Sequence, residues 1–245
     1  MAYLTFELKG DMAMWRNPYE SMGSFSSLGP APSNLAGLFG AALGFATSKS
    51  QALELHDDKK SRQLDKRGLP WPVSAELLEW QKRIDLKVAC RWNSTFPKRV
   101  AWNVNGCKEI DPAKDNLRLQ QQVIDAPCYE VAAELPKEEV SKLTEALREP
   151  AFPLCLGASF CRAIITNITV SDEMPQRGNW AFHTSGFAVG DSVPFSQHVI
   201  NAEESCERIK SSGFWVYPLD ESNSEVVENP FVKTYCYFEM ERHEL

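Results

Sequence analysis

The sequence of 245 residues lacks the short motifs that mark common hydrolases, zinc proteases and nucleotide-binding enzymes. It contains no G-x-S-x-G, no H-E-x-x-H and no P-loop. Its four histidines lie far apart, and no two have the spacing of a metal-ligand pair. We therefore expect no catalytic residue, no bound metal and no cofactor.

Paired cysteines and long apolar runs are also missing. The seven cysteines are scattered and include no C-x-x-C pair, which argues against a disulfide framework or a zinc knuckle. The longest apolar stretch, over 35–46, is too short to span a bilayer, and no basic segment with a long apolar run stands at the start. The sequence predicts a cytoplasmic protein without a membrane partner.

Charge is unevenly distributed along the chain. The formal net charge is −7, which argues against a simple nucleic-acid binder. Residues 56–124 nevertheless carry 14 basic and 9 acidic side chains, whereas 125–245 carry 9 basic and 20 acidic ones. A local basic segment can bind phosphate because charges are screened beyond about 10 Å. The alternative is a fluctuation in surface charge. If the uneven charge is functional, the acidic C-terminal half would face solvent or a basic partner.

Periodicity and turn residues predict an alternating order of strands and helices. Strands are expected over 3–8, 86–92, 129–135 and 160–170, and helices over 34–46, after Ser74 and from Lys137. Residues 10–32 and 47–73 are predicted as loops, and 93–124 as an extended β-hairpin or arm. The resulting βαββαβ order predicts an α+β, ferredoxin-like (RRM-like) fold. We expect this domain over 1–170 and a β-rich extension over 171–245.

Three glycines stand in the predicted helix that Ser33 would cap. Gly37, Gly40 and Gly44 follow i, i+3, i+7 spacing and would share one helical face, although each costs about 1 kcal/mol relative to alanine. One interpretation is close packing of this face on the sheet. The other is a helix start at Ser33 and Asn34 that meets phosphate, where free N–H groups favour anions.

The preceding loop combines aromatic and basic side chains. It contains Trp15, Arg16 and Tyr19, followed by the serines of GSFSS. Aromatic rings and arginine guanidinium groups can stack on unpaired bases. The pattern therefore favours RNA binding, and it is not a dinucleotide-binding fingerprint because the G-x-G spacing is missing.

Two blocks together resemble a known family. KGDMAMWRNPYESMGSFSSLGPAPSNLAGLFGAALG is similar to the N-terminal signature of the CRISPR-associated Cas-five family of the RAMP superfamily, and FPLCLGASFCRA, after the strand RLQQQVIDAPCYEVAAEL, is similar to its second block. The resemblance covers about 4–46 and 118–168. It implies a ferredoxin-like fold with a hairpin "thumb", expected within 93–124.

The resemblance also implies a function and partners. Family members cap the crRNA 5′ handle in type I Cascade complexes, beside a Cas-seven-type backbone subunit and a large subunit that helps read the PAM, so contact with target DNA near the PAM is a further option. The RNA-binding residues predicted on this basis are Lys9, Trp15, Arg16, Tyr19, Ser33, Asn34, Gly37, Arg91, Lys98, Arg99, Arg118, Ser159 and Arg162.

An enzymatic alternative comes from the same resemblance. One branch of the family, in type I-C systems, processes precursor crRNA with a metal-independent Tyr/Lys/His set. Tyr19 could match the tyrosine, but the predicted arm has no histidine. We therefore expect a non-catalytic scaffold, with an endoribonuclease as the alternative.

Overall fold

The computed structural model describes residues 1–16, 26–45, 75–93, 98–107, 116–175, 182–183, 191–201, 206–217 and 231–238. Tyr19 and the predicted connection over 47–73 lie outside these ranges.

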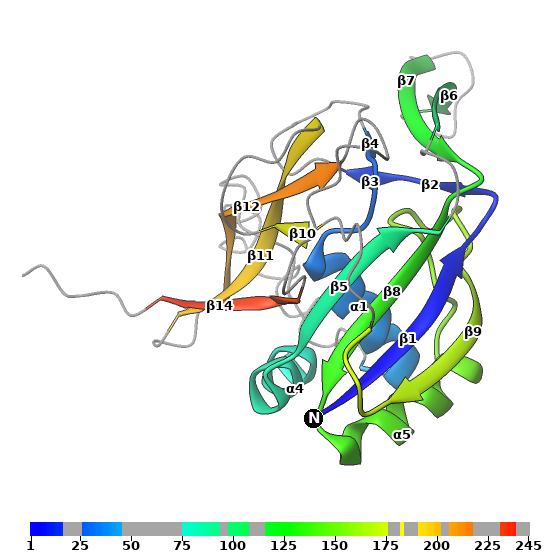
Figure 1. Cartoon of the computed structure of the whole chain (residues 1–245). Coiled ribbons are helices and arrows are strands. Elements are labelled where there is room, and N and C mark those ends of the chain that lie inside the picture. Colours follow the sequence, from blue (N-terminus) through cyan, green and yellow to red (C-terminus); the bar gives the residue numbers. More distant parts are fainter. Residues whose placement is uncertain are drawn as a thin grey trace, which may run out of the picture.

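The largest sheet among the described residues has five strands (Figure 1). Its order is β13-β5-β8-β1-β9, and all neighbours are antiparallel. The strands are β1 (Ala2–Lys9), β5 (Lys87–Trp92), β8 (Cys128–Leu135), β9 (Ile164–Ser171) and β13 (Val232–Lys233). Helices α1 (Pro32–Leu43) and α5 (Lys137–Arg148) lie on one face, and α4 (Ala75–Ile84) lies near the start of β5. The predicted α+β class is confirmed.

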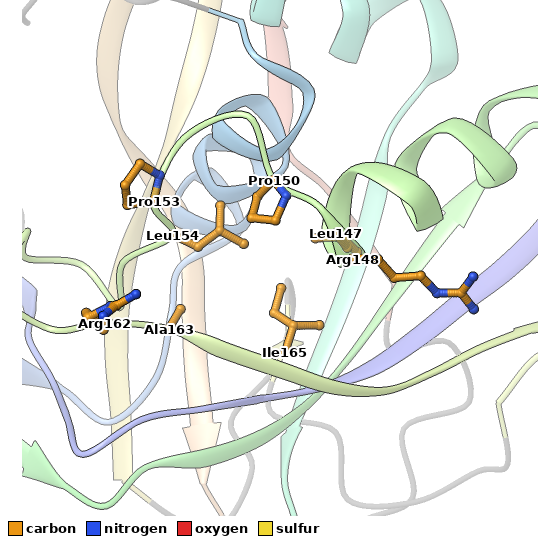
Figure 2. A pocket seen from close by; sticks show the side chains of 8 residues that line it. All are labelled: Leu147, Arg148, Pro150, Pro153, Leu154, Arg162, Ala163 and Ile165. Atoms are coloured by element: carbon orange, nitrogen blue, oxygen red, sulfur yellow. The ribbon is translucent and has the colours of Figure 1, made fainter.

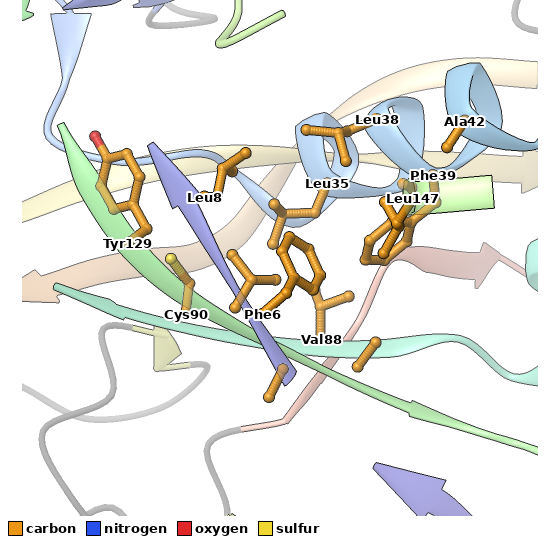
Figure 3. Packing of buried hydrophobic residues seen from close by; sticks show 14 of the residues in the cluster. Phe6, Leu8, Leu35, Leu38, Phe39, Ala42, Val88, Cys90, Tyr129 and Leu147 are labelled. Atoms are coloured by element: carbon orange, nitrogen blue, oxygen red, sulfur yellow. The ribbon is translucent and has the colours of Figure 1, made fainter. Parts of the chain in front are cut away.

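The core lies between this sheet and α1 (Figure 3). Side chains of β1 alternate between buried and half-buried because successive residues of a strand point to opposite faces. Leu4, Phe6 and Leu8 are therefore buried, and the Phe6 ring meets Phe39 of α1 edge-to-face with centroids 6.0 Å apart. Burying each such side chain contributes about 1.5–3 kcal/mol.

Helix α5 presents the apolar face that its spacing predicts. Val140, Leu143, Thr144 and Leu147 are all buried, and the helix follows Pro136 as expected. The face also buries a charge, Glu139, whose carboxylate accepts hydrogen bonds from Trp80 Nε1 (3.1 Å) and Arg83 (3.0 Å) of α4. This carboxylate therefore fastens α4 to α5.

The Glu139 carboxylate should make stability depend on acid pH. Burial raises the pKa of Glu139, but hydrogen bonds from Trp80 and Arg83 and the charges of Arg83 and Lys142 outweigh it, so the pKa lies below its ordinary value. A lowered folded-state pKa gives stability that is present above the unfolded value of about 4.3 and is lost as pH falls through the folded value. We expect Glu139→Gln to lose about 1–3 kcal/mol at pH 7.

Urea unfolding of both proteins at pH 7 and pH 3 checks this prediction. The free-energy difference between them should shrink at pH 3. A difference that stays constant with pH would contradict the assignment.

The predicted arm is a β-hairpin, which we call the thumb. Strands β6 (Lys98–Cys107) and β7 (Asn116–Asp125) pair antiparallel from Lys98↔Asp125 to Cys107↔Asn116. The hairpin extends away from the main sheet (Figure 1). Its base is joined to the N-terminal segment, because β2 (Met12–Ala13) pairs with the end of β7. The hairpin prediction over 93–124 is thus confirmed in its described part.

The C-terminal part contains the additional strands that the sequence predicts. A second sheet has the order β10-β12-β11-β14, built from β10 (Phe182–His183), β11 (Asp191–Asn201), β12 (Cys206–Tyr217) and β14 (Tyr235–Phe238). Short strand β13 instead pairs with β5 at the edge of the main sheet. Beside it, Thr234 N–H donates to the Leu86 carbonyl (3.1 Å), and the rings of Phe231 and Tyr3 are 5.4 Å apart. The segment around β13 therefore completes the main sheet, and a domain boundary after residue 170 stays a prediction.

Several predicted boundaries were wrong. Helix α1 begins at Pro32, so its N-cap residue is Ala31 and not the predicted Ser33. The Ala31 N–H donates to Asn34 Oδ1 (2.9 Å), and this bond stabilises the first turn. Proline suits the first helical position, since its missing N–H needs no partner there. The helix ends at Leu43 instead of about Ala46. Residues 160–163 precede β9 and include the end of a turn and Arg162, which bridges to Cys155. The predicted loop over 10–32 contains three short strands, β2, β3 (Trp15–Arg16) and β4 (Ser26–Ser27).

The three spaced glycines do not share one contact surface. A Cβ at Gly37 would meet no described atom within 4 Å, whereas one at Gly40 would lie 3.1 Å from Leu77 of α4. Gly44 ends the helix with φ +82°, a left-handed conformation that favours glycine. The predicted glycine face is therefore wrong: one glycine is open, one packs against a neighbouring helix, and one is a C-cap.

Candidate nucleic-acid interface

Two glycine-containing segments, 10–16 and 154–163, lie against each other although they are far apart in the chain. Met14 N–H donates to the Leu156 carbonyl (3.0 Å). A Cβ on Gly157, which has φ +87°, would lie 2.0 Å from the Met14 carbonyl oxygen, and one on Gly10 would lie 2.5 Å from that of Arg162. Only glycine allows the two backbones to approach this closely. The two blocks singled out in the sequence thus form one structural unit.

Trp15 anchors this unit from inside. Its side chain is only 2% exposed, and Nε1 donates to Tyr129 Oη at 3.1 Å. Tyr129 in turn donates to the Leu28 carbonyl (2.7 Å), and burial raises the pKa of its hydroxyl well above the ordinary value, so it stays protonated. A ring with no free face cannot stack on a base. Trp15 therefore fixes the loop in this structure and does not offer the stacking surface that was predicted.

The base of the thumb is tied to the same loop. Ser26 Oγ accepts the Trp15 N–H (2.9 Å), and Arg16 pairs with Ser26 through the β3–β4 ladder. From the thumb, Arg99 Nε donates to the Ser26 carbonyl (3.1 Å). The structure thus brings Trp15, the backbone of Arg16 and the Arg99 side chain together around one serine.

The start of α1 carries three more predicted residues. Ser33 and Asn34 lie in its first turn, and Gly37 is exposed one turn further on. Asn34 is engaged in capping through its bond to Ala31. There is no acidic residue in this first turn, so the positive end of the helix dipole is not neutralised there by its own side chains.

Two of the predicted cations have carboxylate partners. Arg91 Nε donates to Glu130 at 2.6 Å, and Lys9 lies 3.5 Å from Glu7. A hydrogen bond from Thr166, together with the charge of Lys9, holds the pKa of Glu7 below its ordinary value, so the carboxylate stays ionised. The neighbouring carboxylates partly neutralise Arg91 and Lys9, and this weakens the attraction of both cations for a phosphate.

Lys98, Ser159 and Arg162 are exposed. Arg162 borders a surface pocket of about 210 Å³, and Arg148 stands on its opposite side (Figure 2). The pocket walls between them are apolar, with Leu154, Ala163 and Ile165 among the lining residues. These exposed polar residues belong to the turn and thumb base, so they border the same unit as Trp15.

Two predicted residues lie wholly or partly outside the described residues. Arg118 lies opposite Asn105 in the thumb ladder, but its side chain is outside the described part, as is the whole of Tyr19. Sequence reasoning also missed residues. Tyr129 and the ring pair of Trp102 and Phe160, with centroids 5.8 Å apart, belong to this region, whereas Ser26 is one of the serines of GSFSS that the sequence pattern includes. Trp102 had a signal, since it stands among basic residues of the arm.

The structure is thus an α+β protein in which a β-hairpin, the thumb, lies next to the close backbone contact between segments 10–16 and 154–163. A family model described as "CRISPR-associated protein (Cas_Cas5)" matches residues 3–179. The chain therefore belongs to the CRISPR-associated Cas5 family, as the sequence resemblance predicts. No curated protein matches the chain.

Several solved structures are similar to the chain. One described as a Cas protein is 17% identical with a TM-score of 0.37, covering 65% of this chain and 59% of its own. A CRISPR RNA-guided surveillance complex chain is 18% identical with a TM-score of 0.44, covering 67% and 60%. SMU1763c from Streptococcus mutans, described as functionally uncharacterized, is 11% identical with a TM-score of 0.39, covering 94% and 97%. The chain thus spans about three fifths of the first two, and the family assignment rests on the family match.

Neither a metal site nor a membrane span is visible among the described residues. They contain no group of three His, Cys, Asp or Glu side chains suited to hold a metal ion. Within the same ranges, no helix is long and apolar enough to cross a membrane.

Proposed function

We propose that this chain is a non-catalytic RNA-binding subunit of a type I CRISPR effector complex, which caps the 5′ handle of the crRNA. The observation that supports this best is that the first family block contacts both other parts: it meets the second block through the Met14–Leu156 hydrogen bond and the thumb through the bond from Arg99 to Ser26. The thumb strand β6 adds Lys98 and Arg99 and has no acidic residue, so it suits a phosphate backbone in an otherwise acidic chain.

The fold supports the same proposal. Strand order β5-β8-β1-β9, with α1 and α5 on one face, suits a ferredoxin-like domain of the RNA-recognition kind. In this class of complex, guide pairing reads the target sequence and protein subunits hold the backbone. The proposed partners are the crRNA handle, a Cas-seven-type backbone subunit and the large subunit, with PAM-proximal DNA as a further candidate ligand.

Changing Arg16 and Arg99 together to alanine should weaken binding of single-stranded repeat RNA. Each lost phosphate contact reduces the slope of log K against log salt by about 0.7, so we expect a slope lower by up to about 1.4. Fluorescence anisotropy at several salt concentrations measures both affinity and slope. Lys137→Ala, which removes an exposed cation at the start of α5, is the control and should change neither. Unchanged affinity and slope in the double variant would refute the assignment.

Incubation of the purified protein with labelled repeat RNA in EDTA separates the scaffold from the endoribonuclease. The proposed scaffold leaves the RNA intact, consistent with a thumb region, 93–124, that contains no histidine. Discrete cleavage products would favour the processing enzyme instead.

A further inference from the structure

Trp102 and Phe160 form an exposed pair of aromatic rings at the boundary between thumb and body. Trp102 lies in β6, and Phe160 lies in the turn before β9. Their centroids are 5.8 Å apart with planes inclined by 59°, yet the side chains remain 43% and 50% exposed. Large aromatic side chains normally lose most of their surface in a folded chain. Contact with each other therefore leaves substantial ring surface open to a ligand.

Two cations, Lys98 and Arg162, lie on either side of the pair, and Asp125 faces Lys98 across the thumb ladder. Alternation along β6 places Lys98 and Val100 on the same face as Trp102, whereas Arg99 points to the other face and reaches Ser26. Lys98 is about 13 Å from Trp102 along the strand. Arg162 follows Phe160 by two residues and is exposed. An anionic ligand with a flat apolar part fits this combination.

We propose that Trp102 and Phe160 form a stacking site for an unpaired base of single-stranded RNA, a proposal that rests on the RNA-binding function above. The base lies against open ring surface of the pair. Lys98 and Arg162 hold the neighbouring phosphates. Stacking on aromatic rings tolerates any base, because every base has a π-face. The stacking contact therefore adds affinity for RNA that is independent of sequence, while the phosphate contacts of Lys98 and Arg162 depend on salt.

A protein partner is a less suitable occupant. Interfaces of stable protein complexes bury about 800 Å² on each side and have a continuous apolar core. Among the side chains described on β6, Val100 is the other exposed large apolar one, and Phe152 and Ile164 are exposed singly on either side of the segment that carries Phe160. The basic charge of β6 and the small extent of the patch favour a nucleic acid.

Binding of two short RNAs by the full chain tests the proposal. One probe is an eight-nucleotide single-stranded RNA, and the other has the same ribose-phosphate chain without bases. Wild-type protein should bind the base-containing RNA more tightly. Since stacking contributes about 1–3 kcal/mol per base, Trp102→Ala should lower affinity for that RNA about 5- to 150-fold, with little effect on the abasic one. Phe160→Ala should act in the same direction, and Trp102→Phe should retain most of the affinity.

Phe152→Ala is the matched control, because Phe152 is similarly exposed (44%) in the segment before the turn. It should leave binding of both RNAs unchanged. Wild-type affinity of Trp102→Ala for the base-containing RNA would overturn the stacking site and leave the proposed function standing; the pair would then be assigned to a protein contact. If the wild-type protein binds neither RNA, the proposed function and the stacking site both fail.

Discussion

Gly157→Ala should destabilise the protein by about 3 kcal/mol or more. The residue has φ +87°, which costs an L-residue about 1–2 kcal/mol. In addition, the new Cβ would lie 2.0 Å from the Met14 carbonyl oxygen and 3.0 Å from the Trp15 ring. Backbone cannot yield as a flexible side chain can, so the two segments must separate. Urea denaturation, read by tryptophan fluorescence, gives the free energy of unfolding.

Gly37→Ala is the control for the Gly157 experiment. Gly37 is exposed in the middle of α1, and a Cβ there meets no described atom within 4 Å. Alanine should therefore stabilise this helix by up to about 1 kcal/mol. The same substitution thus has opposite signs at the two glycines. A loss of less than about 0.5 kcal/mol in Gly157→Ala would contradict the tight backbone contact.

Trp15→Ala should cost about 3–5 kcal/mol, the usual range for truncating a buried large aromatic side chain. The variant leaves a cavity beside Tyr129, whose ring centroid is 6.2 Å from that of Trp15, and removes the indole donor to the tyrosine oxygen. Trp102→Ala truncates an exposed tryptophan and should stay within about 0.5 kcal/mol of wild type. Chemical denaturation of both variants measures the contrast.

RNA binding distinguishes the anchor role of Trp15 from a direct contact. If Trp15 only fixes the loop, Trp15→Phe should keep near-wild-type RNA affinity, because the ring is retained and only the indole N–H is lost. That loss should cost about 0.5–1.5 kcal/mol of stability. A marked drop in affinity for Trp15→Phe at unchanged stability would indicate that the indole touches RNA after all.

Local patterns in the sequence predict most of the individual elements. Alternation identifies β1, helical spacing identifies α5, and the absence of helical spacing over 93–124 indicates the thumb. Boundaries were less accurate where two local signals competed. At the start of α1, Ser33 is a good cap by type, but Pro32 and the bond from Ala31 to Asn34 Oδ1 determine the first turn.

Contacts across the sequence could not be predicted in this way. Trp15 stands in a loop whose aromatic and basic residues are typical of an RNA contact. The residue is nevertheless buried, and its indole donates to Tyr129, which is 114 residues away in the sequence. The sequence predicts only a turn at Gly157. The close contact of its backbone with the Met14 carbonyl is visible only in the structure. The family resemblance linked the two blocks, but only the backbone geometry explains why both need glycine.

The distance in sequence between these contacting segments also affects the order of folding events. Strand β1 pairs with β8 and β9, and the bond from Met14 to Leu156 closes a loop of more than a hundred residues. Contacts between such distant segments form slowly, because loop-closure entropy must be lost before they stabilise the chain. During synthesis on the ribosome, the Trp15 loop therefore cannot form its backbone contact with the 154–163 turn until that turn has been synthesised. A nascent or truncated chain that lacks this turn cannot form the Met14–Leu156 bond that joins the Trp15 loop to the rest of the unit.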